Sequence, residues 1–334
     1  MKQMKKSLAL LMVAVLFVFP LTACGGGADD DVLQIGIIQI MEHPAMDDAR
    51  FGFIQALADE GFVEERGDGE EGILVEFDYI NAQGDASVMT TIAQRFVGND
   101  VNLILTLGTG AVQRTAAETE TIPIVGSAIT NYVLAGVAES NERPGGNVTG
   151  ASDMKPVEAQ IQMIPEFVPD IQSLGILWNS GEANSEYQAE IATRVAEEMG
   201  LTVVHGAVTG PADVQLVTAS VASQVDAIYI PTDNTFATAM NTVAQISLET
   251  GVPVFAAEAN MVMGGGLATL SFSYYDLGYK SGLMAAQILR GESDPAEMPI
   301  QFSTDLFYII NGFMAEELGI VIPPQFEAYI RFPE

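Results

Sequence analysis

The feature that most constrains the fold is the repeated alternation of short apolar runs with helical patterns from Val32 onward. Residues 101–107 form a continuous apolar run, which is typical of a parallel strand buried on both faces. A helical pattern follows over residues 111–118, and the unit recurs along the chain. Repeated strand–helix units predict an α/β fold, a parallel sheet covered by helices on both faces.

The chain length and the order of the strand and helix patterns indicate more than one packed core. The chain has 334 residues, beyond the roughly 250–300 residues at which a single core stops growing. One series of units ends near residue 152, and a second begins with a helical pattern at residues 157–164. We therefore expect two similar lobes.

Charge excludes some partners. The chain has 13 basic and 44 acidic residues, a formal net charge of −31. Such a surface repels nucleic acid and anionic lipid headgroups, so we expect no nucleic-acid partner.

The first 31 residues are the most specific local signal. Three lysines precede an apolar run at residues 8–19, which is too short to span a bilayer comfortably. The run leads to Leu-Thr-Ala-Cys at residues 21–24, which resembles the signal of a bacterial lipoprotein. The resemblance implies a signal peptide at residues 1–23, lipid on Cys24 and a flexible tether at 24–31, so the protein would be extracytoplasmic and membrane-anchored. The alternative is an ordinary secretory signal with an incidental cysteine.

Several strand patterns end in small or polar residues. A buried run at residues 227–230 stops at Pro231 and is followed by Thr-Asp-Asn-Thr at residues 232–235. In open α/β sheets, ligands lie beyond the carboxyl ends of strands. The predicted ligand-binding residues are Gln39, Thr109, Gly110, Ser127, Ala128, Ser152, Asp233, Asn234, Thr235, Glu258 and Tyr274.

Three segments carry a resemblance to a known family. They are PGGNVTG at residues 144–150, YIPTDNT at residues 229–235 and YYDLG at residues 274–278. Together they resemble the ABC-transporter substrate-binding lipoproteins associated with uptake of tryptophan and other aromatic amino acids. One departure is Thr-Asn-Tyr at residues 130–132, where an acidic segment is common in that family.

The resemblance implies a type I periplasmic-binding-protein fold, with two Rossmann-like lobes joined by about three crossovers. Lobe one would hold residues 32–152 and 273–297, and lobe two residues 153–272 and 298–334. A monomer would bind one amino acid, with an aromatic one favoured, in the cleft and deliver it to an ABC permease.

A free amino acid offers an ammonium, a carboxylate and a side chain. Glu258 and Asp233 are the candidates for the ammonium, although each could equally be a solvated loop carboxylate. Hydroxyl and backbone donors at Thr109, Gly110, Ser127 and Ser152 could bind the carboxylate, or could instead cap helices. Tyr274, with Tyr132 and Phe236, could line a pocket for an aromatic ring, or could belong to the core.

Catalysis has little support. There are two histidines and one cysteine, and no Gly-x-Ser-x-Gly motif occurs. Gly108-Thr109-Gly110 lacks the third glycine of a dinucleotide fingerprint. We expect no cofactor, no metal and no enzymatic activity. The alternatives are a sensor lipoprotein for a membrane receptor, a binder of another small solute such as a sugar or purine, and a tethered carboxylate hydrolase.

Overall fold

A computed structural model describes residues 32–65 and 71–331. The predicted signal peptide, Cys24 and the tether at residues 24–31 lie outside the described residues. None of the helices that the structure describes is long and apolar enough to cross a membrane.

The first lobe is built on a seven-stranded sheet in the order β12-β6-β5-β4-β1-β3-β2. All of its paired strands are parallel. The strands are β1 (Leu33–Gln39), β2 (Phe62–Val63), β3 (Ile73–Asn81), β4 (Leu103–Leu107), β5 (Ile124–Ile129), β6 (Val148–Ser152) and β12 (Gln301–Phe302). Every residue of β4 is buried, as the continuous apolar run predicts.

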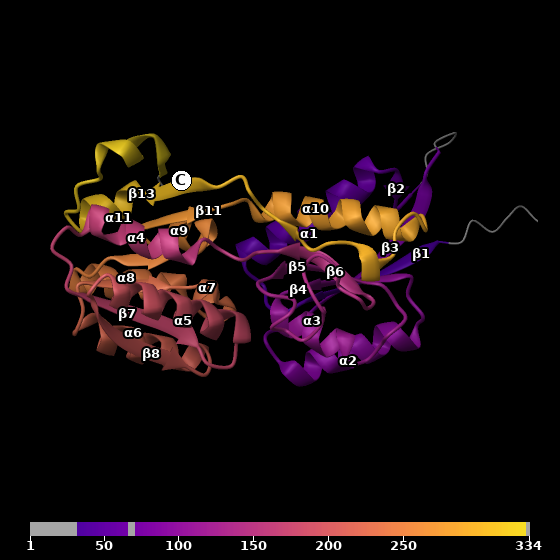
Figure 1. Ribbon diagram of the computed structural model, residues 1–334, viewed down its shortest axis with the longest axis horizontal. Helices are drawn as coiled ribbons and strands as arrows, with labels where there is room; N and C mark the ends of the chain where they lie inside the picture. The colour runs from indigo at the N-terminus through magenta and orange to yellow at the C-terminus, as the bar shows by residue number, and fades with distance from the viewer. Residues whose placement is uncertain (1–31, 66–70, 332–334) are drawn as a thin grey trace, which may run out of the picture. The chain divides into compact units, whose positions relative to one another are not determined.

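Helices cover both faces of this sheet (Figure 1). Helices α1 (Pro44–Asp59) and α10 (Tyr274–Leu289) lie together on one face, and α2 (Ala86–Gly98) and α3 (Thr109–Ala116) lie on the other. Helices α1 and α10 approach so closely that a Cβ on Gly278 would stand 1.8 Å from the carbonyl oxygen of Ala49. The crossing therefore requires a residue without a side chain, and it fixes α10 to the first lobe.

The second lobe contains two sheets. A parallel sheet has the order β10-β9-β7-β8, and a smaller sheet has the order β11-β13-β14. The strands are β7 (Ser173–Asn179), β8 (Thr202–Val208), β9 (Ala227–Ile230), β10 (Val254–Ala256), β11 (Ala268–Ser271), β13 (Phe307–Asn311) and β14 (Ile330–Arg331). The helices are α4 (Val157–Phe167), α5 (Ala183–Glu198), α6 (Val214–Ala222), α7 (Asn234–Thr238), α8 (Met240–Thr250), α9 (Ala259–Met263) and α11 (Gly312–Glu317), with short 3-10 turns η1 (Pro211–Asp213) and η3 (Pro324–Tyr329).

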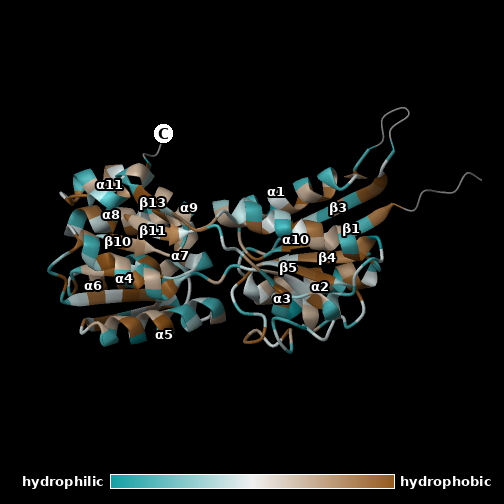
Figure 2. Cartoon of the chain, turned by 45° about the horizontal axis from the view of Figure 1, so that its top comes forward, coloured by the Kyte–Doolittle hydropathy of each residue, from teal (hydrophilic) through white to brown (hydrophobic). Residues whose placement is uncertain are grey.

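Each lobe has its own hydrophobic core. One cluster joins β1, β4 and β5 to α1 and α10 in the first lobe. Two clusters occupy the second lobe, one beneath α4 and α5 and one beneath α6 and α8. Figure 2 shows β1 and β4 as largely hydrophobic strands, whereas the helices carry both hydrophobic and hydrophilic residues. Each lobe therefore buries its own sheets beneath its own helices, as expected for an α/β fold.

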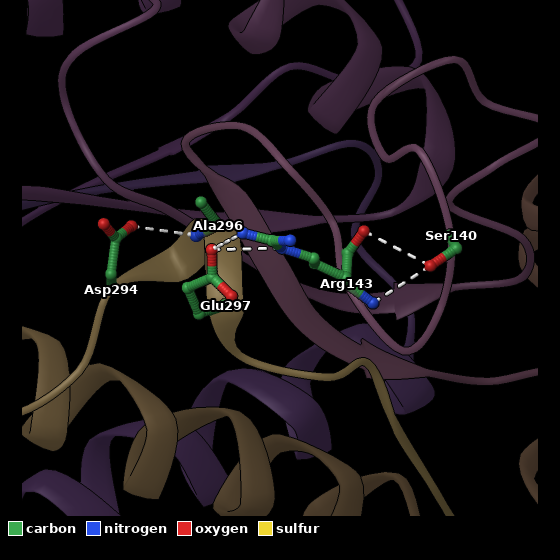
Figure 3. Close-up of polar contacts among 5 residues, drawn as sticks. All are labelled: Ser140, Arg143, Asp294, Ala296 and Glu297. Atoms are coloured by element: carbon green, nitrogen blue, oxygen red, sulfur yellow. Dashed lines mark hydrogen bonds and ion pairs between the residues drawn. The ribbon is translucent and has the colours of Figure 1, made fainter.

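The chain crosses between the lobes three times, after β6, after β11 and after β12. The return segment with η2 (Pro295–Glu297) is held on the first lobe, where Arg143 Nε donates to Glu297 Oε1 at 3.1 Å (Figure 3). Gly145 N donates to the Ala296 carbonyl oxygen at 3.0 Å. Strand β12 then pairs with β6, so the first sheet extends to Phe302. The resemblance had instead implied that residues from 298 onward belong to lobe two.

The α/β prediction with parallel sheets in two lobes is confirmed, with two differences. The lobes are less alike than expected, because β11 pairs antiparallel with β13 in a separate small sheet. The predicted alternation of one strand with one helix is also interrupted after β9, where two helices follow, α7 and α8. Asp233 caps a short first helix, and Ala239, with φ −108°, interrupts the helical path.

Candidate ligand-binding site

The first group of predicted residues lies where β1, β4 and β5 end side by side. Gln39 pairs in register with Leu107, and Leu107 with Ser127. Three side-chain oxygens here are buried and have no hydrogen-bond partner among the described residues: Gln39 Oε1, Thr109 Oγ1 and Ser127 Oγ. Buried polar atoms are normally paired, so this edge of the sheet is suited to a polar ligand.

The backbone around Ser127 is irregular. The register between β5 and β6 shifts between Gly126 and Ile129, which is a bulge. Ala128 lies within it at φ 59°, a conformation that residues with a Cβ seldom adopt. Bulges and left-handed residues of this kind cluster near functional sites, where they redirect the chain.

A cavity of about 210 Å³ is lined by residues of both lobes. Ile40 and Gly110 contribute from the first lobe, and Glu182, Asn234 and Thr235 from the second. Its lining does not include Ser127, Glu258 or Tyr274, which are buried. The predicted residues thus divide between this cavity and a buried polar region.

Asp233 is fully buried and bonded to the protein through both oxygens. Oδ1 accepts from Phe236 N at 2.8 Å, and Oδ2 accepts from Asn179 N at 2.6 Å and Ser185 Oγ at 2.5 Å. Burial, followed by the nearby charge of Glu182, raises the pKa of Asp233 to about 8. Through these bonds the oxygens of Asp233 cap α7 and join it to β7 and α5, so Asp233 has a role within the protein.

Asn234 and Thr235 are arranged around Glu182. Glu182 Oε2 accepts from Asn234 N at 2.9 Å, and Oε1 accepts from Thr235 N at 3.0 Å and from Thr235 Oγ1 at 2.9 Å. His43 Nε2 lies 3.1 Å from Asn234 Oδ1, and burial lowers the pKa of His43. Since the Asn234 amide nitrogen donates to Glu182, His43 is the donor in that bond.

The bond between His43 and Asn234 joins the two lobes. A second one runs from Asn260 Nδ2 to Asp48 Oδ2 at 3.0 Å. A longer contact of 3.5 Å joins Gln188 Nε2 of the second lobe to Thr130 Oγ1 of the first.

Glu258 differs from Asp233 in its hydrogen bonding. It is 1% exposed, and its Oε2 has no hydrogen-bond partner in the part of the chain that the structure describes. Burial raises the pKa of Glu258 to about 8, and the charge of Lys155 opposes that rise. It directly precedes α9, a short helix for which it makes no side-chain cap bond. Glu258 therefore has an unused acceptor oxygen, whereas the oxygens of Asp233 are occupied.

Tyr274 and Ser152 lie at the crossovers. The Tyr274 hydroxyl donates to Asp153 Oδ2 at 2.8 Å, and Thr130 Oγ1 donates to Asp153 Oδ1, also at 2.8 Å. Ser152 Oγ donates to the Thr130 carbonyl oxygen at 2.9 Å and accepts from Met154 N at 3.2 Å. Ser152 is thus used within the protein, and Tyr274 is oriented by Asp153.

Sequence reasoning missed Asp153, Lys155, Glu182 and His43. Lys155 carried a usable signal, because only it and Lys280 remain as lysines after the first six residues. Asp153 directly follows β6 and could have been included by the strand-end rule. The signal for Glu182 and His43 was weak, because both act through contacts between distant segments.

The fold and the site define a two-lobed binding protein of the type I periplasmic-binding-protein class, with polar side chains where strands of both lobes end. Residues 34–329 match the family model described as ABC transporter substrate binding protein. The chain belongs to that family.

Relatives agree with this assignment. A protein of Clostridioides difficile (strain R20291) described as tyrosine-binding protein is 32% identical over 319 residues, covering 92% of this chain and 90% of the relative. An uncharacterised protein of Rickettsia prowazekii (strain Madrid E), RP367, is 22% identical and covers 86% of each.

Two similar solved structures have this fold, one with a bound ligand and one without. A Streptococcus pneumoniae ABC domain in complex with L-Trp is 32% identical with a TM-score of 0.83, covering 90% of this chain and 99% of that one. The ligand-free, open structure of CD0873 from Clostridium difficile is 34% identical with the same coverage, but its TM-score is 0.68. The family and these structures are substrate-binding proteins, which agrees with the expectation of binding rather than catalysis.

Proposed function

We propose that this chain is an extracytoplasmic lipoprotein of an ABC importer that binds a single amino acid, preferentially an aromatic one, and delivers it to the permease. Lipid on Cys24 would anchor it, and a monomer suffices for the mechanism. The relatives that carry L-Trp or the name tyrosine-binding protein support the ligand class.

The observation that carries the proposal is that both lobes contain buried side-chain oxygens without a hydrogen-bond partner among the described residues, Glu258 Oε2 in the second lobe and Thr109 Oγ1 and Ser127 Oγ in the first. An ammonium needs a buried anionic acceptor, which Glu258 supplies. A carboxylate needs donors, which Thr109 Oγ1 and Ser127 Oγ supply beside the first turn of α3. Gln39, Gly110 and the backbone of Ala128 complete this proposed set. Asn234 and Thr235 would line the entrance.

The cavity and the contacts between the lobes support closure around a small ligand. Residues of both lobes line the cavity, whereas Glu258 and Ser127 are outside its lining and buried, as expected when closure shuts a binding region off from solvent. The chain superposes better on the L-Trp complex than on the open structure at nearly equal identity. Together with the His43–Asn234 bond, this supports a closed arrangement, and hinge closure is a known motion of such proteins.

A thermal-shift screen of the purified protein with the twenty amino acids, several sugars and several purines tests the ligand class. Ligand at a hundred times its dissociation constant adds about 2.7 kcal/mol of stability, so a clear rise in melting temperature is expected with phenylalanine, tyrosine or tryptophan. A shift confined to sugars or purines would contradict the proposal.

The anchor is tested separately. Expression of the natural chain and of Cys24→Ala, followed by mass spectrometry of the N-terminus, should give a lipid-modified Cys24 in the natural chain only. An unmodified Cys24 in the mature protein would contradict the lipoprotein assignment without affecting the ligand.

A further inference from the structure

Lys155 is a buried cation with an unusual setting. It is 2% exposed, and its Nζ has no hydrogen-bond partner among the described residues. The Nζ instead lies 3.4 Å from the ring centroid of Phe272 and 4.3 Å from that of Tyr274. Two aromatic faces thus hold an ammonium that would otherwise be costly to bury.

The cluster around Lys155 joins two crossovers to the proposed ligand site. Asp153 and Lys155 belong to the first crossover, after β6, and Phe272 and Tyr274 belong to the second, after β11. Glu258 comes from the second lobe and interacts electrostatically with both Lys155 and Asp153. The ammonium therefore lies at the crossovers, on the rings of Phe272 and Tyr274, where the charges of two buried carboxylates act on it.

Asp153 and Glu258 differ in whether their oxygens already accept hydrogen bonds. Both oxygens of Asp153 accept from the protein, through Thr130 and Tyr274. Oε2 of Glu258 has no partner in the described part of the chain. With all three groups charged, the cluster carries one net negative charge, and that charge matches one ligand ammonium. The face of Tyr274 that Lys155 covers is closed to a ligand ring, so only the other face or the edge of Tyr274 could touch one.

We propose that Lys155 is a positioning residue of the ligand site, a built-in counter-ion that favours the charged form of Glu258, which the ammonium of the ligand requires, and that holds Tyr274 in place. The inference deepens the proposed function and rests on it. Lys155 does not touch the ligand; it acts through Glu258 and Tyr274.

The charged groups facing Glu258 define the expected pH behaviour. Burial raises the pKa of Glu258, and the charges of Asp153 and Glu182 raise it further. The charge of Lys155 and the nearby Tyr274 hydroxyl lower it. Removing the ammonium should therefore raise the pKa of Glu258. The ionised acceptor would then be lost at a higher pH than in the natural protein.

Calorimetric titration with L-tryptophan and L-tyrosine between pH 6 and 8.5 tests this in the natural protein, Lys155→Met and Lys280→Met. Lys280 is the matched control, because its Nζ donates to the Phe302 carbonyl oxygen away from the cluster. We expect affinity in the natural protein to fall as pH decreases. Lys155→Met should bind at least tenfold more weakly at pH 7, with the difference narrowing toward pH 8.5, and Lys280→Met should follow the natural protein.

Two binding results would overturn the inference. One is natural affinity at every pH in Lys155→Met, and the other is an equal loss at every pH, which would indicate a purely structural role. If Lys155→Met does not fold, Lys155→Met with Glu258→Gln should restore folding, because it removes the carboxylate left without its counter-ion; failure of that rescue also overturns it. Absence of binding in the natural protein would instead defeat the proposed function.

Discussion

The loops after β9 and β10 carry two buried carboxylates that look alike by burial and differ by bonding. Asp233 and Glu258 are both fully enclosed, and burial raises the pKa of each to about 8. Three protein donors occupy Asp233, whereas Oε2 of Glu258 has none among the described residues. Burial and pKa therefore do not separate the two carboxylates, whereas their hydrogen bonds do, and only Glu258 keeps an oxygen free for the proposed ligand.

The largest expected effect is on stability in Asp233→Ala. The substitution leaves Asn179 N, Phe236 N and the Ser185 hydroxyl without their acceptor. Each buried donor left without an acceptor costs about 1–3 kcal/mol, so we expect a loss of several kcal/mol in the free energy of unfolding, which chemical denaturation would measure. Asp85→Ala, which removes an exposed cap on α2, is the control and should lose much less. Equal losses of stability in Asp233→Ala and Asp85→Ala would contradict a structural role for Asp233.

Glu258→Gln should show the opposite pattern. The glutamine keeps the shape but removes the charge, so affinity for the amino acid should fall by about 2–3 kcal/mol, or at least about 30-fold. The free energy of unfolding without ligand should stay unchanged or rise, because a buried charge has been removed. Calorimetric titration and denaturation measure the two quantities. A stable variant with natural affinity would remove Glu258 from the site.

The pH dependence of stability sharpens the comparison. Both carboxyl groups have a pKa in the folded state above their unfolded values, so the native protein binds more protons between about pH 4.5 and pH 8. Stability without ligand should therefore rise as pH falls through this window, by at most about 1.4 kcal/mol per pH unit for each group. Denaturation at several pH values measures the slope.

Glu258→Gln provides the control for that slope. Its slope should be shallower than that of the natural protein, because one of the two titrating groups is gone. An unchanged slope would show that the raised pKa of Glu258 does not contribute.

The smallest expected effects concern two serines. Ser127 Oγ has no partner among the described residues, whereas Ser152 Oγ makes two bonds within the protein. Ser127→Ala should cost ligand affinity about 1 kcal/mol and leave stability unchanged, and Ser152→Ala should cost about 1 kcal/mol of stability. Titration and thermal unfolding of both variants measure this. If Ser127→Ala instead lost stability and Ser152→Ala lost affinity, the donors to the ligand carboxylate would lie elsewhere.

Strand-end reasoning located the edges of the sheets well. Gln39, Thr109 and Ser127 lie together as predicted, since parallel strands end at one edge. It could not distinguish Asp233 from Glu258, because both lie shortly after the end of a strand and both directly precede short helices. The choice depends on donors from β7 and α5, which are more than forty positions away from Asp233 in the chain.

The sequence by itself determined the α/β alternation, the two lobes and the family, because periodicity and short motifs are local properties. Only the tertiary structure decided that β12 returns to the first sheet, that the second lobe has two sheets, and that Lys155 lies on the rings of Phe272 and Tyr274. The physical reason is that burial and hydrogen bonding of a charge depend on segments that meet only when the chain is folded.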